Sequence, residues 1–160
     1  MVIWIIGLSG SGKSFLANKI YKRLVKENKK TIFIDGDDIR KFITYDLGYS
    51  VKDRKKNSQM ISDLCKFLEN KGFIVVCSIL SIFKDHQQKN RKKFKKYIQI
   101  YIKSDLKKLI HINSNNVYQS KKNVVGKDIN FPTPYKSHFT IERSDKKKYL
   151  QVFNKIISKI

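Results

Sequence analysis

The chain has 160 residues, a length that suits one compact domain able to bury a core without disulfides or structural metal. Its formal net charge is +22, but the excess is almost all lysine with only five arginines, which favours a solvated surface over a specific nucleic-acid site. The two cysteines share no metal-like or redox-like spacing, so we expect free, buried thiols. The first apolar run is too short for a signal peptide or a membrane span, and we expect a cytoplasmic protein with no membrane partner.

Apolar periodicity predicts strands that alternate with helices along most of the chain. The predicted strands cover residues 2–6, 31–34, 73–79, 97–102 and 139–141. The predicted helices cover residues 13–26, 38–45, 51–70, 85–96, 105–112 and 145–158. Such alternation indicates a three-layer α/β/α fold with a central, mostly parallel sheet, whose ligands bind at the carboxyl ends of the strands.

Residues 113–134 lack this periodicity and are rich in Asn, Ser, Lys, Gly and Pro. A polar segment of this length inside a compact domain is typical of a mobile lid or a binding loop. We therefore predict a lid at approximately 113–134 within a single domain that spans residues 1–160.

The first predicted strand runs directly into a complete phosphate-binding loop, Gly7-Leu8-Ser9-Gly10-Ser11-Gly12-Lys13-Ser14. Glycines let backbone N–H groups converge on phosphate oxygens, and the N-terminus of the next helix adds partial positive charge. A chance glycine-rich turn is the alternative, but every fixed position of the motif matches. We expect Lys13 to bridge the terminal phosphates of ATP and Ser14 to be a ligand of Mg²⁺. The residues expected to bind ATP are Gly7, Ser9, Gly10, Ser11, Gly12, Lys13 and Ser14.

Acidic residues follow the second predicted strand, in Asp35-Gly36-Asp37-Asp38-Ile39-Arg40. This position lies beside the phosphate loop, where a kinase needs carboxylates to organise Mg²⁺ and to orient and deprotonate an acceptor hydroxyl. Asp37 or Asp38 could instead cap the next helix, because Asp is common in turns and at N-caps. Beside a phosphate loop we favour the catalytic interpretation.

Arg54 and Asn57 lie three residues apart near the start of the helix predicted over 51–70. Residues at this spacing project from one helix face, where a guanidinium and an amide can hold an anion and a hydroxyl. Ser50 and Asp53 have a simpler interpretation, because a serine N-cap with an acidic residue three positions later stabilises a helix start. We predict binding for the first pair and capping for the second.

Together these motifs resemble the adenylylsulfate (APS) kinases, which transfer the γ-phosphate of ATP to the 3′-hydroxyl of adenylyl sulfate. The resemblance rests on the phosphate loop, Asp35-Gly36-Asp37-x-x-Arg40, Leu47-Gly48-Tyr49-Ser50 and Asp53-Arg54-x-x-Asn57. It is dense up to about Phe83 and thinner beyond, and it implies a homodimer.

The resemblance also implies residue roles. Asp37 matches the acceptor-side catalytic carboxylate, and Asp35 matches a neighbour that organises the metal together with Ser14. Ser81 matches a serine described as a phospho-intermediate, although direct in-line transfer needs no such step, and Phe83 matches an aromatic that stacks on the acceptor base. The implied catalytic residues are Lys13, Asp35, Asp37 and Ser81. The implied acceptor contacts are Asp37, Arg40, Tyr49, Arg54, Asn57, Leu80, Ser81, Phe83, Lys121, Lys122 and Val125.

The departures from the family pattern lie on the acceptor side. A Phe-Thr-Gly triplet that supplies a second stacking aromatic is replaced by Val124-Val125-Gly126, and stacking is worth about 1–3 kcal/mol per base. An Arg-Asp-Pro-Lys-Gly stretch is replaced by residues 112–116, for which Lys121, Lys122 and Lys127 could compensate. The chain is similar in motif order to the cytidine diphosphoramidate kinases of capsular polysaccharide phosphoramidate biosynthesis, and a pyrimidine stacked on Phe83 alone is physically reasonable.

We weigh three functions. The first is a small-nucleotide 3′-kinase, with cytidine diphosphoramidate as the favoured acceptor and adenylyl sulfate, in sulfate activation, as the alternative. The second is another phosphate-loop kinase that acts on a sugar or shikimate-like alcohol. The third is a basic nucleic-acid-binding protein that uses ATP as a regulatory ligand. For the third, aromatics at 94, 97 and 101 do interleave with lysines, but their spacing fits core packing better.

Overall fold

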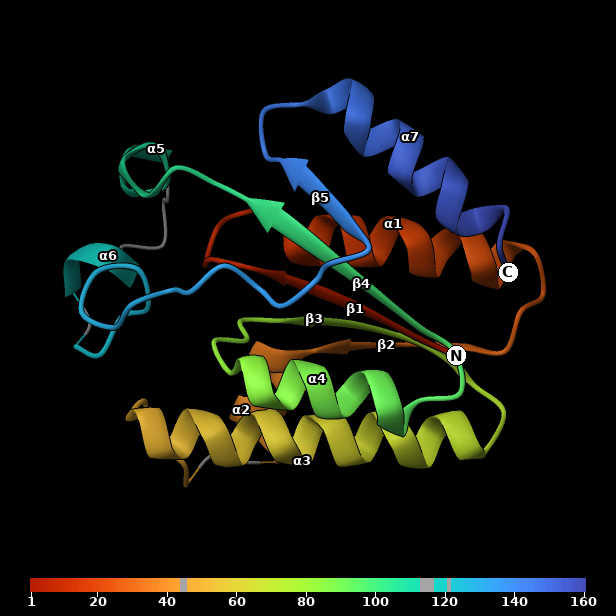
Figure 1. The fold of residues 1–160 in the computed structure, drawn as a ribbon, viewed down its shortest axis with the longest axis horizontal. Coiled ribbons are helices and arrows are strands. Elements are labelled where there is room, and N and C mark those ends of the chain that lie inside the picture. Colours follow the sequence, from red (N-terminus) through yellow and green to blue (C-terminus); the bar gives the residue numbers. More distant parts are fainter. Residues whose placement is uncertain (44–45, 113–116, 121) are drawn as a thin grey trace.

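The computed structural model describes residues 1–43, 46–112, 117–120 and 122–160. Figure 1 shows a sheet between two layers of helices, which confirms the predicted α/β fold. The strands are β1 (Val2–Gly7), β2 (Thr31–Asp35), β3 (Ile74–Ile79), β4 (Tyr97–Lys103) and β5 (Phe139–Glu142). The helices are α1 (Lys13–Lys26), α2 (Gly36–Phe42), α3 (Val51–Asn70), α4 (Lys84–Lys93), α5 (Leu106–Ile112), α6 (Val117–Ser120) and α7 (Lys146–Ile157).

The five strands pair in the order β2-β3-β1-β4-β5, and every pair is parallel. Helices α1 and α7 cover one face of the sheet, and α2, α3 and α4 lie on the other (Figure 1). Strand β1 is central, so both of its faces are buried and its sequence is an unbroken apolar run. Ile3 and Ile5 pack with α1 and α7, whereas Trp4 packs with Ile61 and Cys65 of α3. Because all strands run the same way, the loops after β1, β2 and β3 emerge at one edge.

Several boundaries differ from the sequence prediction. Helix α2 begins at Gly36 because Asp35 caps it, with Asp35 Oδ1 accepting a hydrogen bond from the Asp37 backbone N–H at 2.9 Å. This corrects the alternative in which Asp37 or Asp38 is the cap. Helix α4 ends at Lys93 rather than at residue 96, because Phe94 takes an extended conformation and packs in the core beside Trp4. Residue 45, expected to end the helix after β2, lies outside the described residues.

Two local expectations are confirmed. Ser50 caps α3: its Oγ accepts from the Asp53 backbone N–H at 3.1 Å and donates to Asp53 Oδ2 at 2.6 Å. Cys65 and Cys77 are free and buried. The short helix α6 falls in the segment where no element was expected, and residues 113–116 and 121 of that segment lie outside the described part. Within the described ranges, no helix is both long and apolar enough to span a membrane.

Candidate active site

The loop between β1 and α1 is folded tightly around two glycines. A Cβ on Gly7 would lie 2.6 Å from Ser11 Oγ and 2.8 Å from the carbonyl oxygen of Ile102 in neighbouring β4. Gly12, which precedes α1, has a φ of +97°, a left-handed conformation that glycine adopts without strain. The loop therefore runs close against β4 and turns directly into the N-terminus of α1, the arrangement that suits a bound phosphate.

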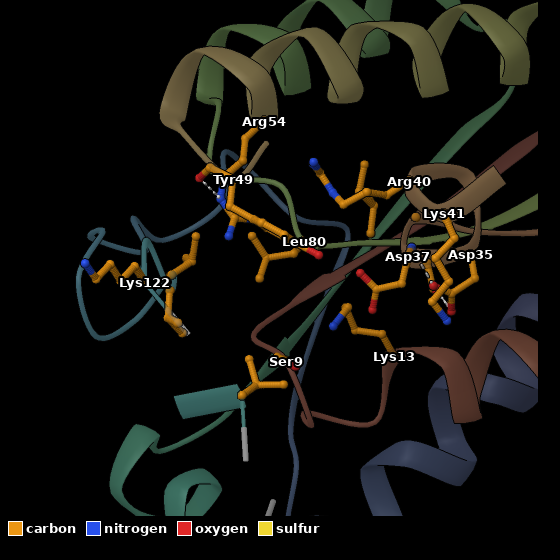
Figure 2. Close-up of a pocket in the computed structure, with 16 residues that line it drawn as sticks. Ser9, Lys13, Asp35, Asp37, Arg40, Lys41, Tyr49, Arg54, Leu80 and Lys122 are labelled. Carbon is orange, nitrogen blue, oxygen red and sulfur yellow. Dashed lines mark hydrogen bonds between the residues drawn. The ribbon is translucent and has the colours of Figure 1, made fainter. Parts of the chain in front are cut away.

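Lys13 begins α1 and reaches back over this loop. Its Nζ donates a hydrogen bond to the carbonyl oxygen of Leu8 at 2.8 Å, and its side chain faces the carboxylate of Asp37 (Figure 2). Burial lowers the pKa of Lys13, while the nearby charges of Asp37 and Asp35 act to raise it. The two carboxylates thus help to keep a partly buried ammonium charged where phosphate oxygens would bind.

Three oxygen-bearing side chains meet beside Lys13. Asp35 Oδ2 accepts hydrogen bonds from Ser14 Oγ at 2.5 Å and from Ser78 Oγ at 2.7 Å. Ser78 stands opposite Asp35 because β2 and β3 pair in that register. Hydroxyl and carboxylate oxygens are the hard ligands that Mg²⁺ prefers, and this ion commonly uses one or two carboxylates with waters and substrate phosphates. The donor set of Ser14 and Asp35 therefore fits Mg²⁺.

Phosphate oxygens would have to complete such a coordination sphere. Among the described residues, no three His, Cys, Asp or Glu side chains are grouped so that they could hold a metal by themselves. A site of this kind binds the metal together with its nucleotide, as expected for a kinase.

Asp37 is held at the cavity by the close approach of α2 to β3. A Cβ on the preceding residue, Gly36, would lie 3.2 Å from Ile79 Cγ1 and 3.3 Å from the carbonyl oxygen of Ser78. This packing and the Asp35 cap fix the first turn of α2. The Asp37 carboxylate therefore stays beside Lys13, at the edge where a transferred phosphate would lie (Figure 2).

The other end of the cavity combines two cations with an aromatic ring. The guanidinium carbons of Arg40 and Arg54 lie 4.9 Å and 5.4 Å from the centre of the Tyr49 ring. Arg40 donates to the carbonyl oxygen of Gly48 at 2.7 Å, and Arg54 donates to those of Tyr49 at 3.1 Å and Asn123 at 2.9 Å. Burial lowers the pKa of Arg54, with Arg40 acting in the same direction, but arginine remains cationic. This end suits an anionic ligand with a flat ring.

One cavity of about 310 Å³ joins the two ends. That volume is in the range of small-molecule sites. The predicted site residues that line it are Ser9, Lys13, Asp35, Asp37, Arg40, Tyr49, Arg54, Leu80, Lys122 and Val125. Gly7, Gly10, Ser11, Gly12 and Ser14 belong to the adjoining phosphate loop and the start of α1. The structure thus brings both sets of predicted residues to one place.

Three described residues predicted on the acceptor side lie outside the lining. Asn57 is 5% exposed within α3, and Ser81 is 1% exposed with its Oγ 3.4 Å from Gln87 Nε2. Phe83 packs in an apolar cluster that contains Ile82 and Leu109, and its ring centre is 5.4 Å from that of His86. Their roles as acceptor contacts, and that of Ser81 in catalysis, stay predictions. Lys121 lies outside the described residues.

Sequence reasoning missed several lining residues. Ser78 begins a stretch that resembles the family but was given no role, because its contact with Asp35 depends on how β2 and β3 pair. Lys41 follows Arg40 directly, and the Asp35–Arg40 motif could have pointed to it. Val117 and Val124 come from the segment without periodicity.

The fold and the loop define a phosphate-loop kinase of the α/β class. Residues 1–142 match the family model described as adenylylsulphate kinase. The chain therefore belongs to the adenylylsulphate kinase family of phosphotransferases.

Relatives within this family differ in their named substrates. The chain is 34% identical over 141 residues to the cytidine diphosphoramidate kinase of Campylobacter jejuni, a match that covers 83% of this chain and 81% of that protein. It is 36% identical over 132 residues to an adenylyl-sulfate kinase of Thermodesulfovibrio yellowstonii, covering 81% of this chain and 65% of the relative. It is 34% identical over 124 residues to a probable adenylyl-sulfate kinase of Bacillus subtilis, covering 76% and 63%. The matched region thus spans a little under two thirds of the last two proteins.

The fold is also that of a solved family structure. The APS kinase CysC of Mycobacterium tuberculosis, in complex with AMPPNP and APS, superimposes with a TM-score of 0.88 at 23% identity, covering 98% of this chain and 95% of that one. At this identity the likeness concerns the fold.

Proposed function

We propose that this protein is an ATP-dependent kinase that phosphorylates the 3′-hydroxyl of a small nucleotide, with cytidine diphosphoramidate as the favoured acceptor, in capsular polysaccharide phosphoramidate biosynthesis. The observation that carries the proposal is the single cavity with two different ends. Lys13 and Asp37 lie at the phosphate-loop end, and Tyr49 lies with Arg40 and Arg54 at the other. A triphosphate and a second nucleotide can therefore meet in it.

On the donor side, the loop amides and Lys13 hold the phosphates of ATP. Lys13 exchanges its bond to the Leu8 carbonyl for a bond to a terminal phosphate oxygen. Ser14 and Asp35 would hold Mg²⁺, which when bound would offset negative charge on the phosphates of ATP. Ser78 keeps the Asp35 carboxylate oriented through its 2.7 Å hydrogen bond.

For the transfer, Asp37 accepts a hydrogen bond from the acceptor 3′-hydroxyl and orients its oxygen for in-line attack on the γ-phosphorus. A bond forms between that oxygen and phosphorus, the bond from phosphorus to the oxygen that leaves with ADP breaks, and the hydroxyl proton passes to Asp37. Lys13 offsets the negative charge that develops on the transferred group. No covalent enzyme intermediate is required, and Ser81 has no step in this scheme.

On the acceptor side, we assign the stacking role to Tyr49 rather than to Phe83. The Tyr49 side chain lines the cavity and is 44% exposed, whereas Phe83 is absent from the cavity lining. Val124 and Val125 offer aliphatic surface in place of a second ring. One aromatic face suits a pyrimidine, and Arg40 and Arg54 would pair with the diphosphate-like group. This choice agrees with the name of the Campylobacter relative.

Adenylyl sulfate is the alternative acceptor, and a specific observation favours it: several relatives of similar identity are named adenylyl-sulfate kinases. Its conversion would give 3′-phosphoadenylyl sulfate. The same cations and the same Asp37 would serve either acceptor.

Steady-state kinetics separate the two acceptors. Purified protein receives ATP, Mg²⁺ and either cytidine diphosphoramidate or adenylyl sulfate, and kcat/KM is measured for each, with Lys13→Met as the control for contaminating kinases. The proposal expects the higher kcat/KM with cytidine diphosphoramidate. A large preference for adenylyl sulfate would reject the pyrimidine acceptor while keeping the 3′-kinase. A homodimer and a cytoplasmic location also remain predictions, and size-exclusion chromatography with light scattering tests the first.

A further inference from the structure

Tyr118 makes a contact that ties the short helix α6 to the phosphate loop. Its hydroxyl donates a hydrogen bond to the backbone carbonyl oxygen of Ser9 at 2.9 Å, across 109 residues of sequence. The side chain is 3% exposed, and burial raises the pKa of its phenol to about 12. The phenol is therefore a protonated donor throughout the neutral range. The segment that follows α6 also supplies Lys122, Val124 and Val125 to the cavity wall.

That segment is itself stiffened by local bonds. The Val124 carbonyl accepts from the backbone N–H groups of Lys127, Asp128 and Ile129, and Asp128 Oδ2 accepts from the Val124 N–H at 2.8 Å. Lys127 Nζ donates to the backbone carbonyl of Tyr118 at 3.0 Å, which joins this turn to α6. These bonds therefore connect α6 to residues that line the acceptor end.

The same segment packs directly on the phosphate loop. Leu8 lies in one buried cluster with Tyr118, Val124 and Val125. Gly126 has a φ of +100°, and a Cβ there would lie 3.1 Å from Leu8 Cδ2. Between these contacts the segment is also held by Arg54, which donates to the Asn123 carbonyl at 2.9 Å. The described residues of this segment thus contact both the phosphate loop and the acceptor-side helix α3.

We propose that Tyr118 is a positioning residue, which sets the phosphate loop at a fixed distance from the acceptor wall through its bond to the Ser9 carbonyl. The inference rests on the proposed two-substrate transfer. Reaction within a bound complex depends steeply on the approach of the two reacting atoms, and a displacement of about 1 Å can cost about 100-fold in rate. Loss of the bond should let ATP bind in a loop that is less well aligned with the acceptor.

Tyr118→Phe tests this, because it removes the hydroxyl and keeps the ring in its apolar cluster. Tyr149→Phe is the matched control: the Tyr149 hydroxyl is also shielded from solvent, but it has no hydrogen-bond partner in the described part of the chain, and the residue lies in α7 outside the cavity lining. We expect Tyr118→Phe to lower kcat/KM for the acceptor about tenfold and to raise the ADP released per acceptor phosphorylated at least threefold. Tyr149→Phe should stay within twofold of the wild type in both.

Two further measurements keep the outcomes distinct. Titration calorimetry measures ATP binding without an acceptor. We expect Tyr118→Phe to raise the Kd of ATP about threefold and Tyr149→Phe to leave it unchanged. If the wild type phosphorylates no nucleotide, the proposed function fails. The ATP titration alone then tests whether the hydrogen bond from Tyr118 positions the phosphate loop. If Tyr118→Phe does not fold, Lys127→Met, which cuts the bond to the Tyr118 carbonyl, should raise the ADP-to-product ratio in the same way. A Tyr118→Phe protein that matches Tyr149→Phe in all these measurements would overturn the inference, as would an unchanged ratio in Lys127→Met.

Discussion

Truncation of Tyr49 tests the acceptor end of the cavity most sharply. Its ring is 44% exposed, and the guanidinium carbons of Arg40 and Arg54 lie 4.9 Å and 5.4 Å from the ring centre. Stacking of a base on an aromatic side chain is worth about 1–3 kcal/mol, and about 1.4 kcal/mol corresponds to tenfold in affinity. Tyr49→Ala should therefore raise the KM of the nucleotide acceptor about 5- to 150-fold. Loss of the ring beneath the two arginines moves the result toward the upper end.

The assay measures initial rates against acceptor concentration at saturating ATP, and then the KM of ATP. Tyr49→Phe is the matched control, since it keeps the ring, and we expect it within about twofold of the wild type. The KM of ATP should not change in either variant, because the phosphate loop lies at the other end of the cavity. Phe83→Leu serves as the comparison, because that ring packs in an apolar cluster. The reasoning is refuted if Tyr49→Ala leaves the acceptor KM unchanged while Phe83→Leu raises it.

Three other predictions concern catalysis, the loop and pH. Asp37→Asn should lower kcat about 100- to 10,000-fold, as expected for loss of a general base. Asp38→Asn, which changes an exposed side chain of the same helix, should leave kcat near the wild-type value. Comparable losses of kcat in the two variants would reject the role of Asp37. Gly7→Ala should lower the free energy of unfolding by about 1–3 kcal/mol in urea titrations, because its Cβ would meet the Ile102 carbonyl at 2.8 Å; an unchanged midpoint would contradict this. Burial holds the pKa of His138 below its ordinary value of 6.5, with Arg91 and Lys159 acting in the same direction. As the pH falls, the imidazole is therefore protonated in the unfolded chain before it is protonated in the folded one. The free energy of unfolding should fall as the pH drops through about 6.5 toward the lower pKa of the folded state. His138→Asn keeps a hydrogen-bond acceptor for the Gln99 N–H, and its Tm should fall less on acidification than that of the wild type. An equal fall in Tm would exclude His138 as a cause of the pH dependence.

The donor half of the site could be predicted because its signals are local. The phosphate loop is one continuous stretch whose glycines are required by the local backbone geometry. The apolar run before it predicts a buried central strand. Asp35 and Asp37 follow the next strand at once, so a parallel sheet brings them to the same edge. Even there the predicted helix boundary was wrong, because Asp35 caps α2 and the helix begins at Gly36 rather than at residue 38.

Other parts of the site depend on contacts between distant segments, which a single sequence does not specify. Ser78 meets Asp35 only through the register of β2 and β3, and Tyr118 meets Ser9 across 109 residues. Phe83 fits a family pattern, yet it lies outside the cavity lining, while Tyr49 lines the cavity with a ring that is 44% exposed. An apolar residue near a cavity can pack in the core or contact the ligand, depending on the tertiary packing around it. The sequence pattern is the same in both cases.

The most direct measurement follows the γ-phosphate itself. ATP labelled in the γ-phosphate is incubated with Mg²⁺, the protein and cytidine diphosphoramidate, and the position of the label in the product is determined by mass spectrometry and phosphorus NMR. We predict that the label appears on the 3′-oxygen of the nucleotide, in an amount equal to the ADP formed, and that Asp37→Asn slows its appearance about 100- to 10,000-fold. Release of the label as inorganic phosphate, with neither cytidine diphosphoramidate nor adenylyl sulfate gaining it, would contradict the account that two nucleotides meet in this cavity.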